Sequence, residues 1–404
     1  MSRHYSTRHF FRQVPNALLK QYFDERGLLQ DVDFSALTET KVGPLFDAWM
    51  GLSEGDRKEM DAEFQAIFDL SCEKGFNAIL DEIRWRKQGN RSELQALIGR
   101  LSALSSHYHR AMLTYLELHN CWRGATLFYH ADTLSYWRKR RNMGRGPAAV
   151  DTESLRALAV RIGEFFHLTE GRGKNCEVEY YRRGGLDYYF SFPEDFSRHS
   201  TEWVDGEFGR RPHHPAFQVV FVFSPNDGTL DLNFRGPVRA IEPMQEMFAT
   251  EILKLKELPP NPGDLRVYDL NRFLEPGFSF VYPSDGFIER VAIRKLRLSS
   301  RTIKGDRITV EADSSRGSDA IYRLIQDIEK AIPLDVYNVT QVELSASVRK
   351  TGAADRSSSV LVRITHPNSC SLKYDKSGLQ LRKMLEMSGI ELKERDQSTE
   401  SGPE

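Results

Sequence analysis

Residues 94–145, LQALIGRLSALSSHYHRAMLTYLELHNCWRGATLFYHADTLSYWRKRRNMGR, decide how the N-terminal part of the chain folds. Every seventh residue of this stretch is aliphatic or aromatic: Leu94, Leu101, Tyr108, Tyr115, Trp122, Tyr129 and Tyr136. Because seven residues span almost two helical turns, these side chains lie along one slowly drifting face of a helix. We call this set the aromatic ladder and interpret it as core, since apolar stripes at helical spacing usually face one. Gly124, which costs about 1 kcal/mol in a helix interior, favours division of the ladder into two or more helices.

The sequence around the ladder predicts a helical domain over residues 1–170, without strands. Apolar residues recur at helical spacing in 6–26, with a break at Pro15, and again in 53–87 and 151–167. Ser53 is expected to begin one of these helices as its N-cap.

The apolar period changes from 3.6 to 2 after residue 170. Arg183-Gly184-Gly185 separates two short strand patterns and indicates a hairpin, and the apolar run 217–223 indicates a central strand. Leu230 and Leu232 alternate with Asp231, which predicts a half-buried strand. The same kinds of pattern predict strands at 277–282, 288–298, 307–312, 339–348 and 360–364, and helices from 237, at 318–332 and at 379–387.

These patterns together predict an α+β fold. An all-helical N-terminal domain, 1–170, precedes a region of antiparallel β-sheet with packed helices. The Pro-rich stretch 259–263 is read as a linker that divides this region into an α+β domain, 171–258, and a second α+β unit, 264–392. The polar tail, 393–404, is expected to be disordered.

Composition limits the classes of partner. The 404 residues carry a formal net charge of −1, so any affinity for DNA or RNA must come from a local patch. No run of ~18 apolar residues occurs, so no membrane partner is expected. Four cysteines without metal-site spacing predict reduced thiols and a cytoplasmic protein. The acid-free stretch before Asp24 leaves an organelle transit peptide as an alternative.

No catalytic signature occurs in the chain. Phosphate-binding, dinucleotide-binding, serine-hydrolase and zinc-protease motifs are all missing from the sequence. Glu177, Glu179 and Asp187 fall on expected strands, but no lysine follows at the spacing of a metal-dependent nuclease. We therefore assign no catalytic residue, no metal and no cofactor, and favour a non-catalytic protein.

The first candidate site is a basic run that ends the ladder. Its cations are Arg138, Lys139, Arg140, Arg141 and Arg145, next to Tyr136 and Trp137. Such a run can neutralise phosphates while an aromatic ring stacks on a base. The alternative is a solvated helix end whose charges suit the helix dipole.

The second candidate is the insertion 193–215, which carries Arg210, Arg211, His213 and His214. Loops longer than ~12–15 residues inside a domain are usually functional or disordered. The two arginines and two histidines can hold an anion or nucleic acid, or, with His199 and nearby acids, a metal ion. A plain surface loop is the third interpretation.

The third candidate is a basic hairpin around Arg294, Lys295 and Arg297. Its other cations are Arg290, Arg301, Lys304 and Arg307. This ribbon can follow a phosphate backbone. The favoured alternative is that its charges protect an edge strand from aggregation.

Three functions follow from these patches. The first is a non-catalytic binding protein for DNA or RNA that uses basic and aromatic patches. The second is an adaptor or regulatory subunit that docks a protein partner through the helical domain. The third is an enzyme with its site in 193–215. In a nearly neutral chain, the first hypothesis requires cations from distant segments to converge on one surface.

Overall fold

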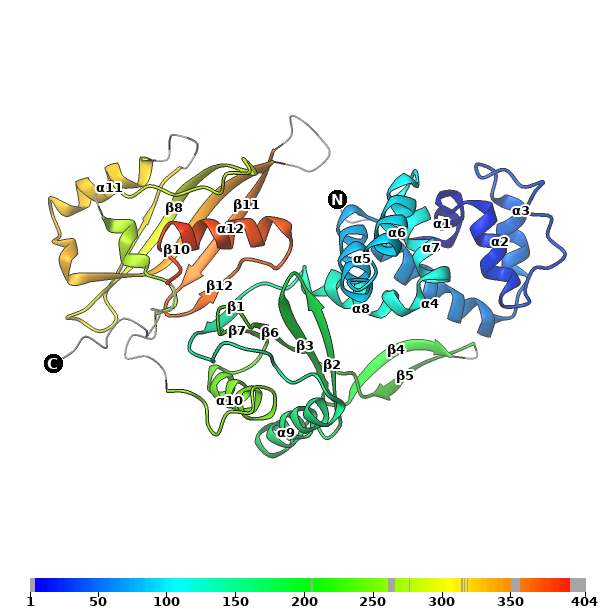
Figure 1. The fold of residues 1–404 in the computed structure, drawn as a ribbon, viewed down its shortest axis with the longest axis horizontal. Coiled ribbons are helices and arrows are strands. Elements are labelled where there is room, and N and C mark those ends of the chain that lie inside the picture. Colours follow the sequence, from blue (N-terminus) through cyan, green and yellow to red (C-terminus); the bar gives the residue numbers. More distant parts are fainter. Residues whose placement is uncertain are drawn as a thin grey trace. The chain divides into compact units, whose positions relative to one another are not determined.

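The computed structural model describes residues 4–204, 206–260, 266–275, 277–313, 315, 317, 319–349 and 357–392 (Figure 1). Its fold is α+β, as predicted: helices form the N-terminal part, and an antiparallel sheet of ten strands dominates the rest. The chain divides into two compact units, residues 1–133 with 182–184, and residues 134–181 with 185–404. The predicted tail, and most of the predicted linker, lie outside the described residues.

The first unit consists of short helices around one hydrophobic core. Ser53 accepts a hydrogen bond from the backbone N–H of Asp56 at 3.1 Å, which confirms the predicted helix start. The break predicted at Pro15 is also confirmed. The helices described here are α1 (Thr7–Gln13), α2 (Asn16–Asp24), α3 (Gly43–Met50), α4 (Glu54–Leu70), α5 (Glu73–Arg86), α6 (Arg91–Ala103), α7 (His107–Glu117) and α8 (His119–Ala131).

The aromatic ladder runs through α6, α7 and α8, and its residues up to Tyr129 belong to this core or pack against it, as predicted. The division into several helices is confirmed, but its expected cause was wrong. The chain breaks around Leu104–Ser106 and at Leu118, whereas Gly124 lies buried within α8. A Cβ atom on Gly124 would stand 2.4 Å from the carboxyl carbon of Glu82 on α5. Glycine at this position therefore leaves room for the Glu82 carboxylate against α8.

The second unit is built on the ten-stranded sheet, whose strand order is β2-β3-β6-β7-β1-β12-β11-β10-β8-β9. The hairpin predicted around Gly184-Gly185 and the buried central strand β6 are both confirmed. The strands are β1 (Trp137–Arg140), β2 (Cys176–Arg183), β3 (Leu186–Pro193), β6 (Val219–Ser224), β7 (Thr229–Phe234), β8 (Ile288–Ser300), β9 (Arg307–Glu311), β10 (Tyr337–Arg349), β11 (Ser357–Thr365) and β12 (Ser369–Cys370).

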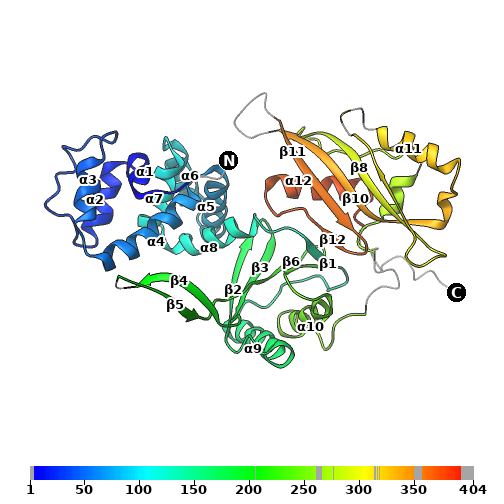
Figure 2. The same ribbon diagram turned by 180° about the vertical axis from the view of Figure 1, so that it is seen from behind.

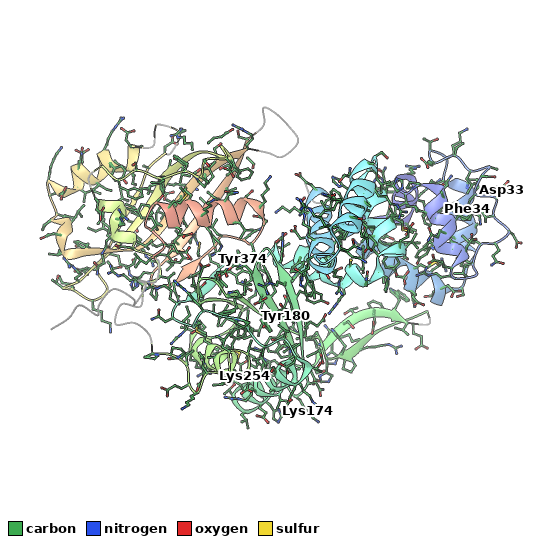
Figure 3. The ribbon with its side chains drawn as sticks, in the orientation of Figure 1. Asp33, Phe34, Lys174, Tyr180, Lys254 and Tyr374 are labelled. Carbon is green, nitrogen blue, oxygen red and sulfur yellow. The ribbon has the colours of Figure 1, made fainter. Side chains whose placement is uncertain are left out.

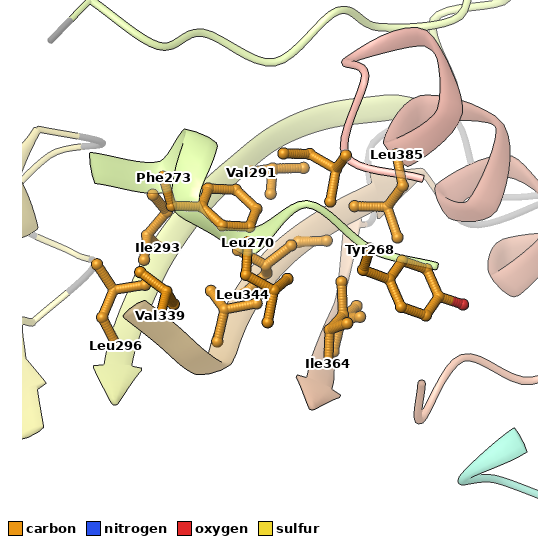
Figure 4. Packing of buried hydrophobic residues seen from close by; sticks show 14 of the residues in the cluster. Tyr268, Leu270, Phe273, Val291, Ile293, Leu296, Val339, Leu344, Ile364 and Leu385 are labelled. Carbon is orange, nitrogen blue, oxygen red and sulfur yellow. The ribbon is translucent and has the colours of Figure 1, made fainter. Parts of the chain in front are cut away.

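Helices cover opposite faces in the two halves of this sheet. In the β2-β3-β6-β7 half, α9 (Thr152–Glu170) and α10 (Ile241–Glu251) share a core with the strands. In the β11-β10-β8 half, the 3-10 helix η2 (Leu270–Leu274), α11 (Ala320–Glu329) and α12 (Lys376–Met387) form a second core. Figure 4 shows this core, with Phe273 of η2 among aliphatic side chains of β8 and β10.

Strand β1 corrects the prediction that residues 1–170 contain no strand. It pairs antiparallel with β7 on one side and β12 on the other, and so joins the two halves of the sheet. The sequence concealed it because three of its four residues are cations, so no apolar alternation marks a strand.

Two other predictions were wrong. Residues 277–282 form no strand, although Phe278 and Phe280 pack beside Phe273. The insertion 193–215 is not a plain loop: β4 (Arg198–Val204) and β5 (Glu207–His213) form a separate two-stranded sheet. This hairpin, which we call the arm, extends away from β2 and β3 in Figures 1 and 2.

No helix in the described part of the chain is long and apolar enough to cross a lipid bilayer.

Candidate nucleic-acid interface

The basic run after the ladder is divided by the geometry of β1. Lys139 and Arg140 are 9% and 6% exposed, and they point to opposite faces of the sheet. Arg140 donates to Gln245 on α10 at 3.2 Å and to the Pro259 carbonyl at 2.6 Å. Both cations therefore hold parts of the second unit together and are withdrawn from any surface that binds a ligand.

Lys139 belongs to a buried cluster of charged and phenolic groups. Its ammonium bonds to Glu391 and lies 3.5 Å from the carboxylate of Asp231 on β7. Burial disfavours the ammonium, but the two carboxylates outweigh burial and raise the pKa of Lys139, so it stays charged. Asp231 also accepts a bond from Tyr374, which is labelled in Figure 3. The prediction that β7 is half-buried was wrong at this position, since Asp231 is only 2% exposed.

The same cluster contains two more buried groups. Arg382 of α12 lies 3.9 Å from Asp231 and stacks 4.4 Å over the Tyr374 ring. Burial raises the pKa of Tyr268 well above its usual value, so the phenol is neutral. Figure 4 shows the hydroxyl oxygen of Tyr268 pointing away from the aliphatic core. The charges of this cluster compensate one another, which suits a structural role at the join of the two half-sheets.

Arg138 is placed differently, because it faces away from the cluster. Strand register sets it opposite Ser369 of β12, which pairs with Thr365 of β11. Thr365 pairs with Gln341 of β10, and Gln341 pairs with Arg297 of β8. Directly paired residues point to the same face of a sheet. We call this row, Arg138, Ser369, Thr365, Gln341 and Arg297, the polar row.

The members of the polar row on β12, β11, β10 and β8 lie on the face of this half-sheet that helices do not cover. Arg138 stands at the join of the two halves, is half-buried, and shares its face of β1 with Arg140, which contacts α10. Leu296 and Leu298, the neighbours of Arg297, point into the core that η2, α11 and α12 share. Arg297 therefore points the other way, as does Leu361 of β11, which is 50% exposed. Figure 1 looks onto α12 in front of β10 and β11, whereas Figure 2 turns the opposite face to the viewer.

The polar row brings together cations from two of the three predicted patches. Arg138 and Arg297 stand at its ends, separated by four strand spacings of roughly 4.8 Å, or about 19 Å. Arg297 donates to Thr340 at 3.4 Å. Among the described residues, no carboxylate pairs with Arg138 or with Arg297. Two guanidinium groups therefore remain available on one polar surface.

A second row beside it is largely neutral. Arg363 of β11 donates twice to Glu343 of β10, at 2.9 and 2.6 Å. Lys295 and Arg294 share Glu311 of β9, at 3.3 and 3.2 Å. Lys295 and Arg294 therefore contribute less positive charge to the surface than the sequence suggested.

Tyr136, the last residue of the aromatic ladder, lies beside this second row. It precedes β1, is 53% exposed, and is close enough to Arg363 to affect that guanidinium electrostatically. Its backbone has φ +65°, a left-handed conformation that costs a non-glycine residue about 1–2 kcal/mol. Strained residues of this kind gather at functional sites, so the exposed ring is part of the candidate interface.

The other two cations of the run lie in the loop after β1. Arg141 donates to the Arg266 carbonyl at 2.8 Å, and Arg145 is exposed. Neither belongs to a helix, so the alternative reading of this run as a helix end was also wrong.

The arm carries the cations of the second patch. Arg210, Arg211, His213 and His214 are all exposed. Register places Arg210 opposite Thr201 and Arg211 opposite Ser200, so the two arginines point to opposite faces and do not converge on one anion. His214 lies 3.1 Å from Glu194.

At the end of the arm, Trp203 and Phe208 face each other across the two strands. They are 65% and 64% exposed, with ring centroids 5.1 Å apart. Sequence analysis did not single out this pair, although two aromatics flanking an Asp-Gly turn are a recognisable hairpin signal.

Within the described residues, no group of three or more His, Cys, Asp or Glu side chains is placed to hold a metal ion. Comparisons with protein-family models, with curated proteins and with solved structures found no match for this chain.

Proposed function

We propose that the protein binds nucleic acid through the uncovered face of its C-terminal half-sheet. The observation that carries this proposal is the polar row, in which Arg138 and Arg297, 159 positions apart in the sequence, reach one face through continuous strand register. Their separation of about 19 Å matches five to six nucleotides at roughly 3.4 Å of rise each.

The rest of the row suits a polyanion. Ser369, Thr365 and Gln341 lie between the arginines and supply hydroxyl and amide donors, which often contact phosphate and sugar. Tyr136 supplies an exposed ring on which a base can stack. No carboxylate stands in the polar row itself, and the carboxylates of the next row, Glu343 and Glu311, are paired with cations.

The test is binding of fluorescently labelled DNA and RNA, single-stranded and duplex, measured by anisotropy over a range of salt concentrations. The variant Arg138→Gln with Arg297→Gln is expected to bind about tenfold more weakly at low salt. Its slope of log K against log salt is expected to be shallower by about 1.8 on duplex DNA, or about 1.4 on a single strand.

Arg323→Gln is the matched control, because Arg323 is 69% exposed on α11, which packs against the opposite face of the same half-sheet. This control is expected to bind like the wild type. Failure of the wild type to bind any probe at low salt would overturn the proposal, as would equal losses in the control and the double variant.

The two other functions expected from the sequence remain predictions. An adaptor would use the helical unit, and an enzyme would use the segment 193–215. We place the binding activity in the cytoplasm, and the free state of all four cysteines is in keeping with a reducing compartment.

A further inference from the structure

The arm divides its side chains between two faces of different chemistry. Trp203 and Phe208 share a face with Thr201, Arg210 and His199, because paired and alternate residues point the same way. The opposite face carries Arg211 together with Glu202 and Glu207. We call the first face the aromatic face. Among its described side chains, the ionisable groups are cationic or neutral, and no carboxylate belongs to it.

Exposure of the aromatic pair is the unusual feature. Burial of a phenylalanine-sized side chain contributes about 1.5–3 kcal/mol, so aromatic rings normally lie in a core. Trp203 and Phe208 instead leave about two thirds of their surface in solvent, at the end of a sheet that has two strands only. They pack on each other and keep an outer surface free for a flat partner.

The base of the arm is held by ion pairs of Asp195. Asp195, just before β4, accepts a bond from Arg172 at 2.7 Å and pairs with Arg198. Burial favours the neutral acid, but Arg172, the backbone N–H of Phe196 and Arg198 together outweigh burial and lower the pKa of Asp195, so the carboxylate stays charged. The anchored base presents the aromatic face at a defined position.

We infer that the aromatic face binds unpaired bases of single-stranded nucleic acid, with the rings of Trp203 and Phe208 stacking on bases and Arg210 contacting the backbone. This inference rests on the proposed function. A nucleobase has a flat π-face and requires no sequence-specific donor, and a nearby cation meets the phosphate. In a duplex the bases are already stacked and cannot reach the rings, so the arm discriminates between the two forms.

Protein partners also favour Trp and Arg, but the charge distribution favours a polyanion. Among the described side chains of the two arm strands, the aromatic face offers Arg210 and His199 without a carboxylate, whereas Glu202 and Glu207 belong to the opposite face. A protein epitope for this face would itself have to be acidic, and the experiment separates that outcome.

The experiment compares the full chain with four variants on a labelled single-stranded oligonucleotide and on a blunt duplex. Trp203→Ala, Phe208→Ala and Arg210→Ala are expected to weaken single-strand binding, the first two by about fivefold to hundredfold. Arg211→Ala is the matched control, since it removes the same charge from the adjacent residue on the opposite face. It is expected to change binding by less than twofold.

Tryptophan emission supplies an independent readout. Trp203 is exposed, unlike the buried Trp49 and Trp137, so stacking is expected to quench its emission on titration with unlabelled single strand. Trp203→Phe keeps a stacking ring, so it is expected to retain most of the affinity while losing the quench.

The Arg138→Gln, Arg297→Gln variant, measured in parallel, separates the two proposals. If it binds weakly while the arm variants bind like the wild type, the proposed function stands and the inference on the arm is wrong. Equal losses for Arg210→Ala and Arg211→Ala also overturn the inference, since the arm would then act by charge alone. Loss of a protein partner in the aromatic variants, with nucleic-acid binding unchanged, overturns it as well.

Discussion

Glu82 on α5 is a carboxylate enclosed by the first unit. Its side chain is fully buried, Arg86 donates to one oxygen at 2.5 Å, and the other oxygen has no hydrogen-bond partner within the described part of the chain. Burial, opposed only in part by Arg86, raises the pKa of Glu82 from 4.5 to about 6. A buried carboxyl group with one unsatisfied oxygen makes folding of this unit sensitive to mildly acidic pH.

The sign of this sensitivity follows from proton binding. Between pH 6 and 4.5 the folded state binds the Glu82 proton more readily than the unfolded state. Glu82 therefore destabilises the fold above pH 6, and this penalty is lost as pH falls through 6 toward 4.5. A shift of this size corresponds to about 2 kcal/mol. We expect the unfolding free energy of the wild type, relative to Glu82→Gln, to rise by that amount from pH 7.5 to 4.5.

Urea unfolding followed by circular dichroism at several pH values measures this difference. Glu59→Gln, at an exposed position on α4, is the control and is expected to follow the wild type at every pH. A wild-type curve parallel to that of Glu82→Gln would contradict the prediction.

Helix packing in the first unit depends on the glycine that faces Glu82. A Cβ atom on Gly124 would stand 2.4–2.5 Å from the Glu82 carboxylate, closer than any real contact. Gly124→Ala gains about 1 kcal/mol of helix propensity, but overpacking between α5 and α8 costs about 1–3 kcal/mol. We expect a net loss of stability, seen as a lower melting temperature.

Gly99 of α6 gives the opposite case, because nothing lies within 4 Å of an added Cβ there. Gly99→Ala is therefore expected to stabilise the protein by about 1 kcal/mol. A melting temperature for Gly124→Ala at or above that of the wild type would show that α8 shifts without penalty.

The elements that were predicted correctly are those whose apolar residues recur with a strong helix or strand period. The helices of the ladder and the buried strand β6 have side chains whose partners are set by local spacing. Strand β1 lacked an apolar period because three of its four residues are cations. The arm lacked one because most of the residues of β4 are polar. Residues 277–282 show the reverse error: Phe278 and Phe280 alternate but pack outside any strand.

The candidate interface was predictable only as a list of residues. Arg138 and Arg297 were both expected to bind a polyanion, as was Lys139, which is buried beside Asp231. Arg138 and Lys139 are neighbours on β1, and their side chains point to opposite faces of the sheet. Their direction depends on pairing with β7 and β12, whose paired residues are 90–233 positions distant in the chain. Such pairing is not encoded in local spacing.

At the scale of the whole molecule, net charge restricts the ways in which the proposed binding of nucleic acid could occur. A chain with formal charge −1 gains no general attraction, so its affinity depends on a few contacts. Arg138 and Arg297 on the half-sheet, Arg210 on the arm, and a partly neutralised Lys295 give about four phosphate contacts at most. For a single strand, four contacts correspond to a slope of log K against log salt of about −3.

We therefore expect a tenfold rise in salt to lower single-strand affinity by about a thousandfold, with no further loss from charge elsewhere. Anisotropy titrations at four or more salt concentrations give the slope, and Arg210→Ala is expected to make it shallower by about 0.7. A slope steeper than about −6 would require many more cations than these surfaces present, and would place the interface elsewhere on the chain. A slope near zero would mean that phosphate contacts contribute little, which is incompatible with binding along the polar row.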